Sequence, residues 1–78
     1  MKLNNIKWTQ ISENLLYGYI NNNLIYCICG TCNNYLLEWK QSENSVWIWV
    51  AYIDTIDDSK LKAETHYNNL IKWLMGKY

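Results

Sequence analysis

The sequence predicts an α+β fold: an antiparallel sheet of four to five strands, connected as a meander, followed by one C-terminal helix packed on one face. Up to Ile53, apolar and aromatic residues arrive in short runs separated by Asn, Gly, Ser and Glu, a pattern typical of strands and turns. After Ile53 the apolar spacing changes to threes and fours, which indicates an amphipathic helix. The 78 residues, 50% of them hydrophobic, fit a single domain over residues 1–78.

The apolar runs predict strands near residues 6–12, 15–20, 24–29, 34–41 and 46–53. The segments between several of them are short and rich in turn-forming residues, at 21–23, 30–33 and 42–45. Connections this short join neighbouring antiparallel strands, so we expect the strands to lie side by side in chain order.

The helix is predicted over residues 57–75. Oxygen-bearing side chains at residues 55–59 can cap its N-terminus, and Gly76 is placed to end it. The apolar stripe consists of Ala63, Tyr67, Leu70, Ile71, Leu74 and Tyr78. We expect the helix to pack on the sheet through Tyr67, Leu70, Ile71 and Leu74.

Three cysteines lie in the stretch CICGTC at residues 27–32. Cys27 and Cys29 are two residues apart on a predicted strand and therefore point to the same face. We expect these cysteines to be reduced and to pack as small hydrophobic residues, with no metal and no cofactor. Two alternatives stay open: a zinc site built from Cys27, Cys29, Cys32 and His66, and a disulfide that involves Cys32.

The sequence carries no recognisable catalytic arrangement. It has no Ser/His/Asp set, no paired carboxylates on one face and no Gly-rich phosphate loop, since its three glycines are scattered. His66 has no carboxylate or nucleophile arranged with it in the sequence. We therefore expect that this chain is not an enzyme.

The charges limit the classes of partner. Seven basic residues, all of them Lys, balance seven acidic ones, so there is no basic field to attract nucleic acid. Direct nucleic-acid binding is disfavoured further because Arg, the usual residue for bidentate phosphate contacts, is absent. No apolar run is long enough to span a bilayer, and the first ten residues lack the apolar middle of a secretion signal. A cytoplasmic chain without a membrane partner is expected.

The stretch SVWIWVAYI is apolar on both faces of its predicted strand. Simple alternation puts Val46, Ile48, Val50 and Tyr52 on one face and Trp47, Trp49, Ala51 and Ile53 on the other. One helix covers only one face, so the second must be covered by the N-terminal strands, by a second copy or by a partner. We expect an aromatic binding face at Trp47 and Trp49, with Tyr35 and Trp39 as second choices.

The order of YLLEW, a turn, VWIWV and then DDSKLKAETHY resembles a recurring pattern of small phage and prophage proteins. The positions that carry the resemblance are Gly30, Tyr35, Trp39, Trp47, Ala63, His66, Tyr67, Ile71 and Leu74. The cysteines and the Trp47/Trp49 pair depart from that pattern. In size, composition and class the chain is similar to anti-CRISPR proteins, which occlude a surface of a host enzyme.

This resemblance implies a small inhibitor that binds a bacterial defence complex, such as a CRISPR-Cas effector, in the host cytoplasm through an aromatic sheet face. A homodimer is an alternative assembly. Two other functions stay open. One is a single-stranded nucleic-acid-binding module that stacks bases on Tyr35, Trp39, Trp47 and Trp49. The other is a small zinc-stabilised domain.

Overall fold

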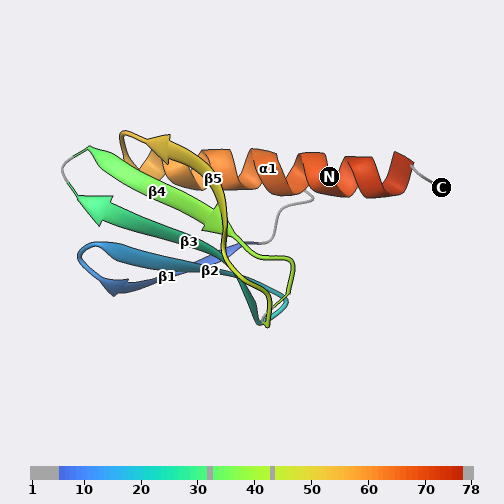
Figure 1. The fold of residues 1–78 in the computed structure, drawn as a ribbon, viewed down its shortest axis with the longest axis horizontal. Coiled ribbons are helices and arrows are strands. Elements are labelled where there is room, and N and C mark those ends of the chain that lie inside the picture. Colours follow the sequence, from blue (N-terminus) through green and yellow to red (C-terminus); the bar gives the residue numbers. More distant parts are fainter. Residues whose placement is uncertain (1–5, 32, 43, 77–78) are drawn as a thin grey trace.

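The protein is a five-stranded antiparallel sheet with one helix on one side (Figure 1), as the sequence predicts. The computed structural model describes residues 6–31, 33–42 and 44–76, with side chains described up to residue 72. The elements, in chain order, are β1 (Lys7–Ser12), β2 (Leu15–Ile20), β3 (Asn23–Thr31), β4 (Asn34–Trp39), β5 (Ile48–Ile53) and α1 (Ile56–Gly76). The strands lie in the order β1-β2-β3-β4-β5, a meander. The C-terminal half of α1 extends past the strands (Figure 1).

The β2–β3 turn consists of asparagines in a backbone conformation that asparagine tolerates. Asn21 and Asn22 have φ values of 51° and 66°, and asparagine tolerates this left-handed conformation better than most residues. Two such residues in succession connect Ile20 directly to its partner Asn23, as expected for a tight hairpin.

Strand boundaries differ from the predicted ranges at β3, β4 and β5. β3 is longer than residues 24–29 because it pairs with β2 and β4 on its two sides. β4 ends at Trp39, which pairs with Ile48, so β5 begins there rather than at Val46. The segment between them contains a turn closed by a hydrogen bond from the Ser45 amide to the Ser42 carbonyl, at 3.0 Å.

Cross-strand pairing defines which residues share a face of the sheet. One paired row consists of Trp8, Gly18, Tyr26, Trp39 and Ile48. The next row on the same face consists of Gln10, Leu16, Ile28, Leu37 and Ala51. Tyr26, Ile28 and Leu37 are fully buried, so the core lies between this face and α1. We call it the inner face.

Gly18 allows a large ring to lie directly on the inner face. A Cβ atom at this position would come within 2.8 Å of the Trp8 ring, closer than real Cβ contacts allow. Trp8 in turn lies 6.3 Å from Tyr26, measured between ring centroids. Glycine in this strand therefore makes room for an indole that extends the aromatic packing of the core.

Helix α1 begins with a side-chain cap and packs closely through small residues. The Thr55 hydroxyl oxygen accepts a hydrogen bond from the Asp58 amide at 3.0 Å, and Asp57 and Asp58 lie in the positive first turn. Ser59 and Ala63 are fully buried, because their short side chains let the helix backbone approach the sheet. The buried Ser59 hydroxyl donates to the Thr55 carbonyl at 2.8 Å, which satisfies its polar group.

The predicted packing stripe is confirmed in part. Tyr67 packs against the core, and Leu70 and Ile71 are half-buried. The side chain of Leu74 and the residue Tyr78 lie outside the described part of the structure. The stripe also begins earlier than predicted, because Ile56 packs against the same core.

The buried centre of the core gives a stability prediction. Leu37→Ala should lower the free energy of unfolding by about 2–5 kcal/mol, because it leaves a cavity between the sheet and the helix. Leu61→Ala is the matched control, since Leu61 is 60% exposed on α1, and its effect should stay within about 0.5 kcal/mol. Urea unfolding followed by circular dichroism measures both. Equal losses in the two variants would contradict this placement of the core.

Candidate functional site

We call the face of the sheet opposite α1 the outer face, and two of its paired rows run across all five strands. The first row consists of Thr9, Tyr17, Cys27, Glu38 and Trp49. The second row consists of Ser12, Leu15, Cys29, Leu36 and Tyr52. Strands β1 and β2 lie in the same sheet and do not fold over this face. Among the described elements, none packs on it, because α1 contacts the sheet from the inner side.

Trp49 and Tyr52 form an exposed aromatic pair at one edge of the outer face. Their ring centroids are 6.2 Å apart, and the two side chains are 60% and 65% exposed. Simple alternation is wrong at this point, since it puts Tyr52 on the face opposite Trp49. The reason is a bulge: Leu37 pairs with Ala51 and Glu38 pairs with Trp49, which leaves Val50 as an extra residue.

The β5 residues that follow the bulge therefore lie on the opposite faces from those that simple alternation predicts. Ala51 and Ile53 pair with Leu37 and Tyr35 and therefore belong to the inner face, where the alternation pattern had grouped them with Trp49. Tyr52 is an exposed aromatic residue of the outer face that the sequence pattern did not place there. A bulge of one residue leaves no separate signal in a strand that is apolar on both faces.

The four predicted binding residues do not form one surface. Tyr35 and Trp39 are half-buried and pack against the core on the inner face. Trp47 precedes β5 and is half-buried, with the Lys40 Nζ atom 4.8 Å from its ring centroid. Of the four, Trp49 alone lies in the rows of the outer face.

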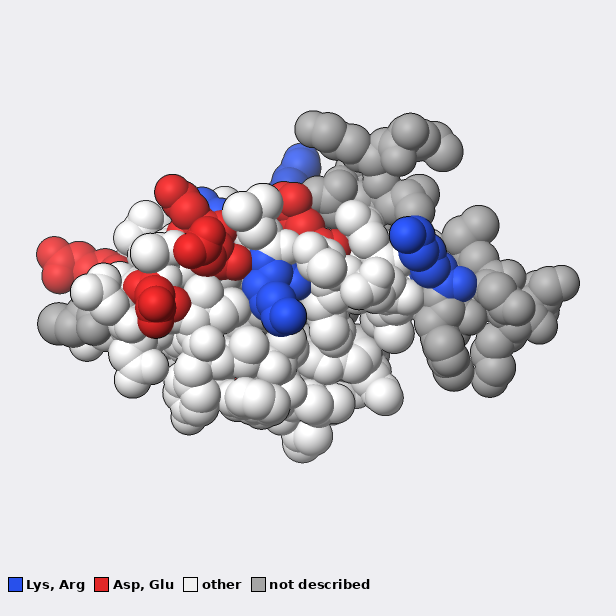
Figure 2. All heavy atoms as spheres, turned by 90° about the horizontal axis from the view of Figure 1, so that it is seen from above, with Lys and Arg blue, Asp and Glu red and all other residues white. Residues whose placement is uncertain are grey.

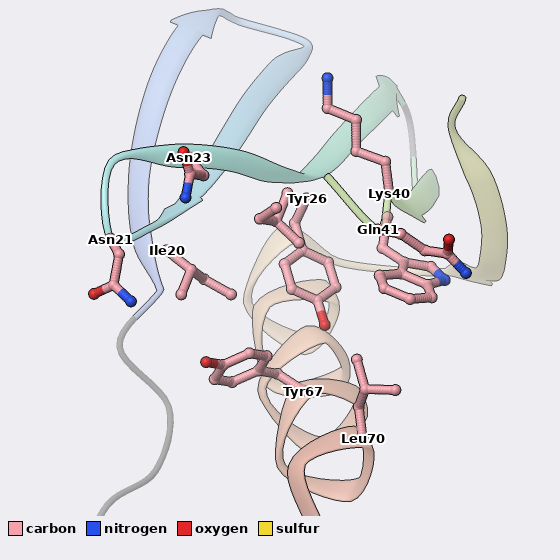
Figure 3. Close-up of a pocket in the computed structure, with 10 residues that line it drawn as sticks. Ile20, Asn21, Asn23, Tyr26, Lys40, Gln41, Tyr67 and Leu70 are labelled. Atoms are coloured by element: carbon pink, nitrogen blue, oxygen red, sulfur yellow. The ribbon is translucent and has the colours of Figure 1, made fainter. Parts of the chain in front are cut away.

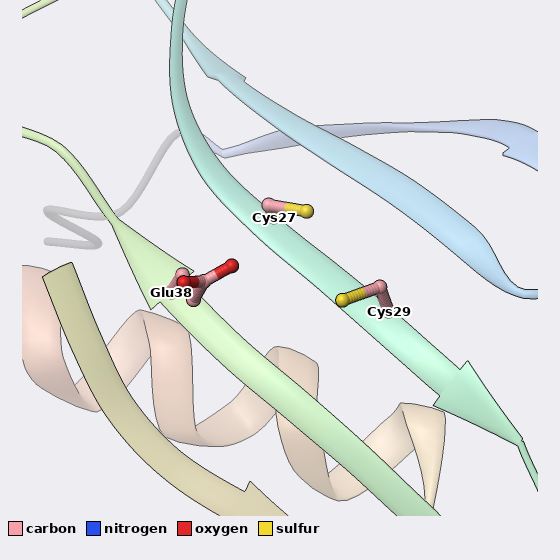
Figure 4. A group of neighbouring side chains, drawn as sticks. All are labelled: Cys27, Cys29 and Glu38. Carbon is pink, nitrogen blue, oxygen red and sulfur yellow. The ribbon is translucent and has the colours of Figure 1, made fainter. Parts of the chain in front are cut away.

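Near the middle of the outer face, two thiols and a carboxylate come together (Figure 4). Cys27 and Cys29 project from the same side of β3, as the sequence predicts, and Glu38 is the β4 partner of Cys27. Both cysteines are free thiols. Burial, then the charges of Cys29 and Glu38, raises the pKa of the Cys27 thiol to about 12. With this raised pKa, and without a bound metal, the Cys27 thiol stays protonated at neutral pH and is a poor nucleophile.

His66 lies on the other side of the sheet from Cys27 and Cys29, which argues against the alternative zinc set that the sequence left open. Its Nδ1 atom is 2.8 Å from the Tyr26 hydroxyl oxygen, and its ring centroid is 5.0 Å from that of Trp39. Both partners belong to the inner face, whereas Cys27 and Cys29 belong to the outer face. Cys32 lies outside the described residues.

His66 is a neutral hydrogen-bond partner inside the core. Burial, and then the charge of Lys62, lowers its pKa from the usual value of 6.5. Burial also raises the pKa of the Tyr26 phenol, so this hydroxyl keeps its proton. We assign the phenol as the donor and Nδ1 as the acceptor, which places the imidazole proton on Nε2.

Charged side chains gather on the opposite side of the molecule. Figure 2 views the helix-bearing side, where acidic and basic groups are interspersed. The charged residues of α1 are Asp57, Asp58, Lys60, Lys62, Glu64 and Lys72. The five strands contain only Lys7 and Glu38. The helix therefore presents most of the charged surface, whereas the strands contribute only Lys7 and Glu38 to the outer face.

A pocket of about 180 Å³ lies at one end of the core, between the sheet and α1 (Figure 3). Tyr26 reaches into it from β3, and Tyr67 and Leu70 face it from the helix. This volume is below the range of about 300–1,000 Å³ that is usual for small-molecule sites. We interpret it as incomplete packing at the end of the core.

Comparison of the chain with protein-family models, curated proteins and solved structures finds no match. Within the described residues, no helix combines the length and the apolar character needed to cross a bilayer.

The lowered pKa of His66 predicts a dependence of stability on pH. The unfolded chain binds a proton at a higher pH than the folded chain, so stability is lost as the pH falls below about 6.5. His66→Gln removes the titrating group and keeps an acceptor for Tyr26. Between about pH 7.5 and about pH 5.5, the unfolding free energy should fall more for the native chain than for this variant. If urea unfolding shows the same fall in unfolding free energy for the native chain and for His66→Gln, the neutral His66 is ruled out.

Proposed function

We propose that this chain is a small protein-binding module that docks the outer face of its sheet on another protein and occludes a surface of that partner. The observation that carries the proposal is the Trp49–Tyr52 pair, two large exposed aromatic rings in contact on a face that no described element covers. Trp and Tyr are enriched among the residues that dominate binding energy at protein interfaces. Tyr17, Leu15 and Leu36 continue this apolar surface across the sheet.

The charge of the outer face favours a protein partner over a nucleic acid. Among its strand residues this face carries Glu38 near its middle and a single lysine, Lys7, on the edge strand β1. Binding of single-stranded nucleic acid combines aromatic stacking with a positively charged groove for the phosphates. A carboxylate in the middle of the face would repel phosphate, so the stacking alternative has less support.

Glu38 also favours a different protein over a second copy of this chain. A two-fold dimer built on this face would apply the same patch on both sides of the interface. With the two-fold axis near the middle of the face, the two Glu38 carboxylates would lie close together in a poorly solvated interface, where like charges are costly. A partner with a complementary group at that point avoids the cost.

The finer part of the proposal concerns the partner. The resemblance to small phage inhibitors supports a bacterial defence complex, such as a CRISPR-Cas effector, as the target in the host cytoplasm. The free thiols of Cys27 and Cys29 fit a reducing compartment. The proposed action is occlusion without catalysis, which fits a Cys27 thiol that remains protonated.

A binding experiment tests the outer face. Trp49→Ala and Tyr52→Ala should each weaken capture of a partner from bacterial lysate by about thirtyfold, since an aromatic residue that dominates an interface contributes about 2 kcal/mol. Leu61→Ala is the matched control, an equally exposed apolar residue on the helix. Circular dichroism establishes that the variants are folded. Undiminished capture of the same protein by both folded variants would remove the outer face from the proposal.

The proposed target has its own test. A bacterial strain with active CRISPR immunity should become permissive to a targeted phage when it expresses the native chain or Leu61→Ala. The strain should stay immune when it expresses Trp49→Ala. Unchanged immunity with the native chain across several CRISPR-Cas types would overturn the target class, while the lysate experiment still tests docking.

A further inference from the structure

The cluster of Cys27, Cys29 and Glu38 brings three metal-binding donor atoms into one small volume. The two sulfur atoms and a carboxylate oxygen all lie within 4.8 Å of one another. The cysteines are alternate residues of β3, and Glu38 lies directly across from Cys27 on β4. Figure 4 shows the three side chains on the side of the sheet away from α1.

These distances are close to those of a tetrahedral zinc centre. Zn–S bonds of about 2.3 Å and Zn–O bonds of about 2.1 Å place neighbouring ligand atoms roughly 3.5–3.8 Å apart. The three donors therefore need to approach one another by no more than roughly 1.0–1.3 Å, which side-chain rotation can supply. We propose that Cys27, Cys29 and Glu38 supply three ligands of a Zn²⁺ site on the outer face.

The types of donor select the metal. Two thiolates favour a soft or borderline ion and disfavour Mg²⁺ and Ca²⁺, which bind oxygen ligands. The single carboxylate favours Zn²⁺ over Cu⁺, which prefers sulfur ligands alone. The three ligands from the described residues leave one tetrahedral position for water or for a further donor atom.

The positions of the ligands are held by the fold. β3 is paired on both sides, with β2 and with β4, so its backbone is fixed at the cysteines. Cys27 is 6% exposed, while Cys29 and Glu38 are half-buried. Leu15 and Leu36, the partners of Cys29, border the cluster with apolar side chains. A metal here would be anchored in a rigid, partly dry setting, which strengthens coordination.

This site differs from the set that the sequence suggests. Glu38 takes the place of His66, which the fold positions on the inner face. In the sequence, Glu38 stands out as a carboxylate within the apolar run YLLEW, which forms β4 between β3 and β5. Such a residue has no core role on that face, which leaves its carboxylate available as a ligand.

Metal titration of the purified full-length chain tests the proposal. Co²⁺ should bind with one ion per chain and give the visible bands of a tetrahedral site and the thiolate-to-metal charge-transfer band in the near ultraviolet. Zn²⁺ should displace it, and Mg²⁺ should not. Absence of the thiolate band in the reduced native chain would overturn the site.

Matched variants identify the ligands. Cys29→Ser and Glu38→Gln should each weaken Co²⁺ binding by at least about tenfold. Glu13→Gln, an exposed carboxylate outside the cluster, should bind Co²⁺ as the native chain does. Glu38→Gln keeps the size of the side chain, so this comparison holds even if a cysteine variant fails to fold. Equal affinities for Glu38→Gln and Glu13→Gln, or loss of binding in Cys32→Ser but not in Cys29→Ser, would overturn the assignment.

The titration needs no partner, so its result is separate from the proposed docking function. Loss of the metal site would leave the Trp49–Tyr52 surface unaffected. Loss of docking in Trp49→Ala would leave Co²⁺ binding unchanged, because Trp49 supplies no ligand.

Discussion

A single helix can cover only one face of a sheet, and the organisation of this protein follows from that constraint. The inner face and α1 together form the core, in which Tyr26, Ile28 and Leu37 are fully buried. The outer face keeps two rows of mostly apolar and aromatic side chains with no described element over them. Burying this second face requires something from outside the described chain, which is why the functional proposals concentrate there.

The inner face illustrates how polar groups are tolerated in a small core. Tyr26 and His66 satisfy each other through one hydrogen bond, and their rings also meet edge to face, 5.8 Å apart. A neutral imidazole needs less solvation than a charged one, so burial beside Trp39 is compatible with stability near neutral pH. This arrangement makes the single histidine part of the core and removes it from any site on the outer face.

The outer face combines two features that act independently. Trp49 and Tyr52 offer a large apolar contact surface at the β5 edge, and Cys27, Cys29 and Glu38 offer donors near the centre. A Zn²⁺ ion whose fourth ligand came from a partner would place a directional bond beside an apolar surface. The bond would fix the orientation of a partner, while the aromatic rings would supply most of the contact area.

The sequence by itself determined the elements and their order, because those depend on local spacing. The change of period after Ile53 places the helix, and short Asn-rich and Ser-rich turns give a meander. The shared face of Cys27 and Cys29 also follows from alternation. The tertiary structure alone decided the faces of the last strand and the neighbours of the cysteines. A bulge at Val50 joins Trp49 to Tyr52, and strand register brings Glu38 to Cys27 while the sheet separates both from His66. Register and bulges arise from pairing between strands, so no pattern within one strand reveals them.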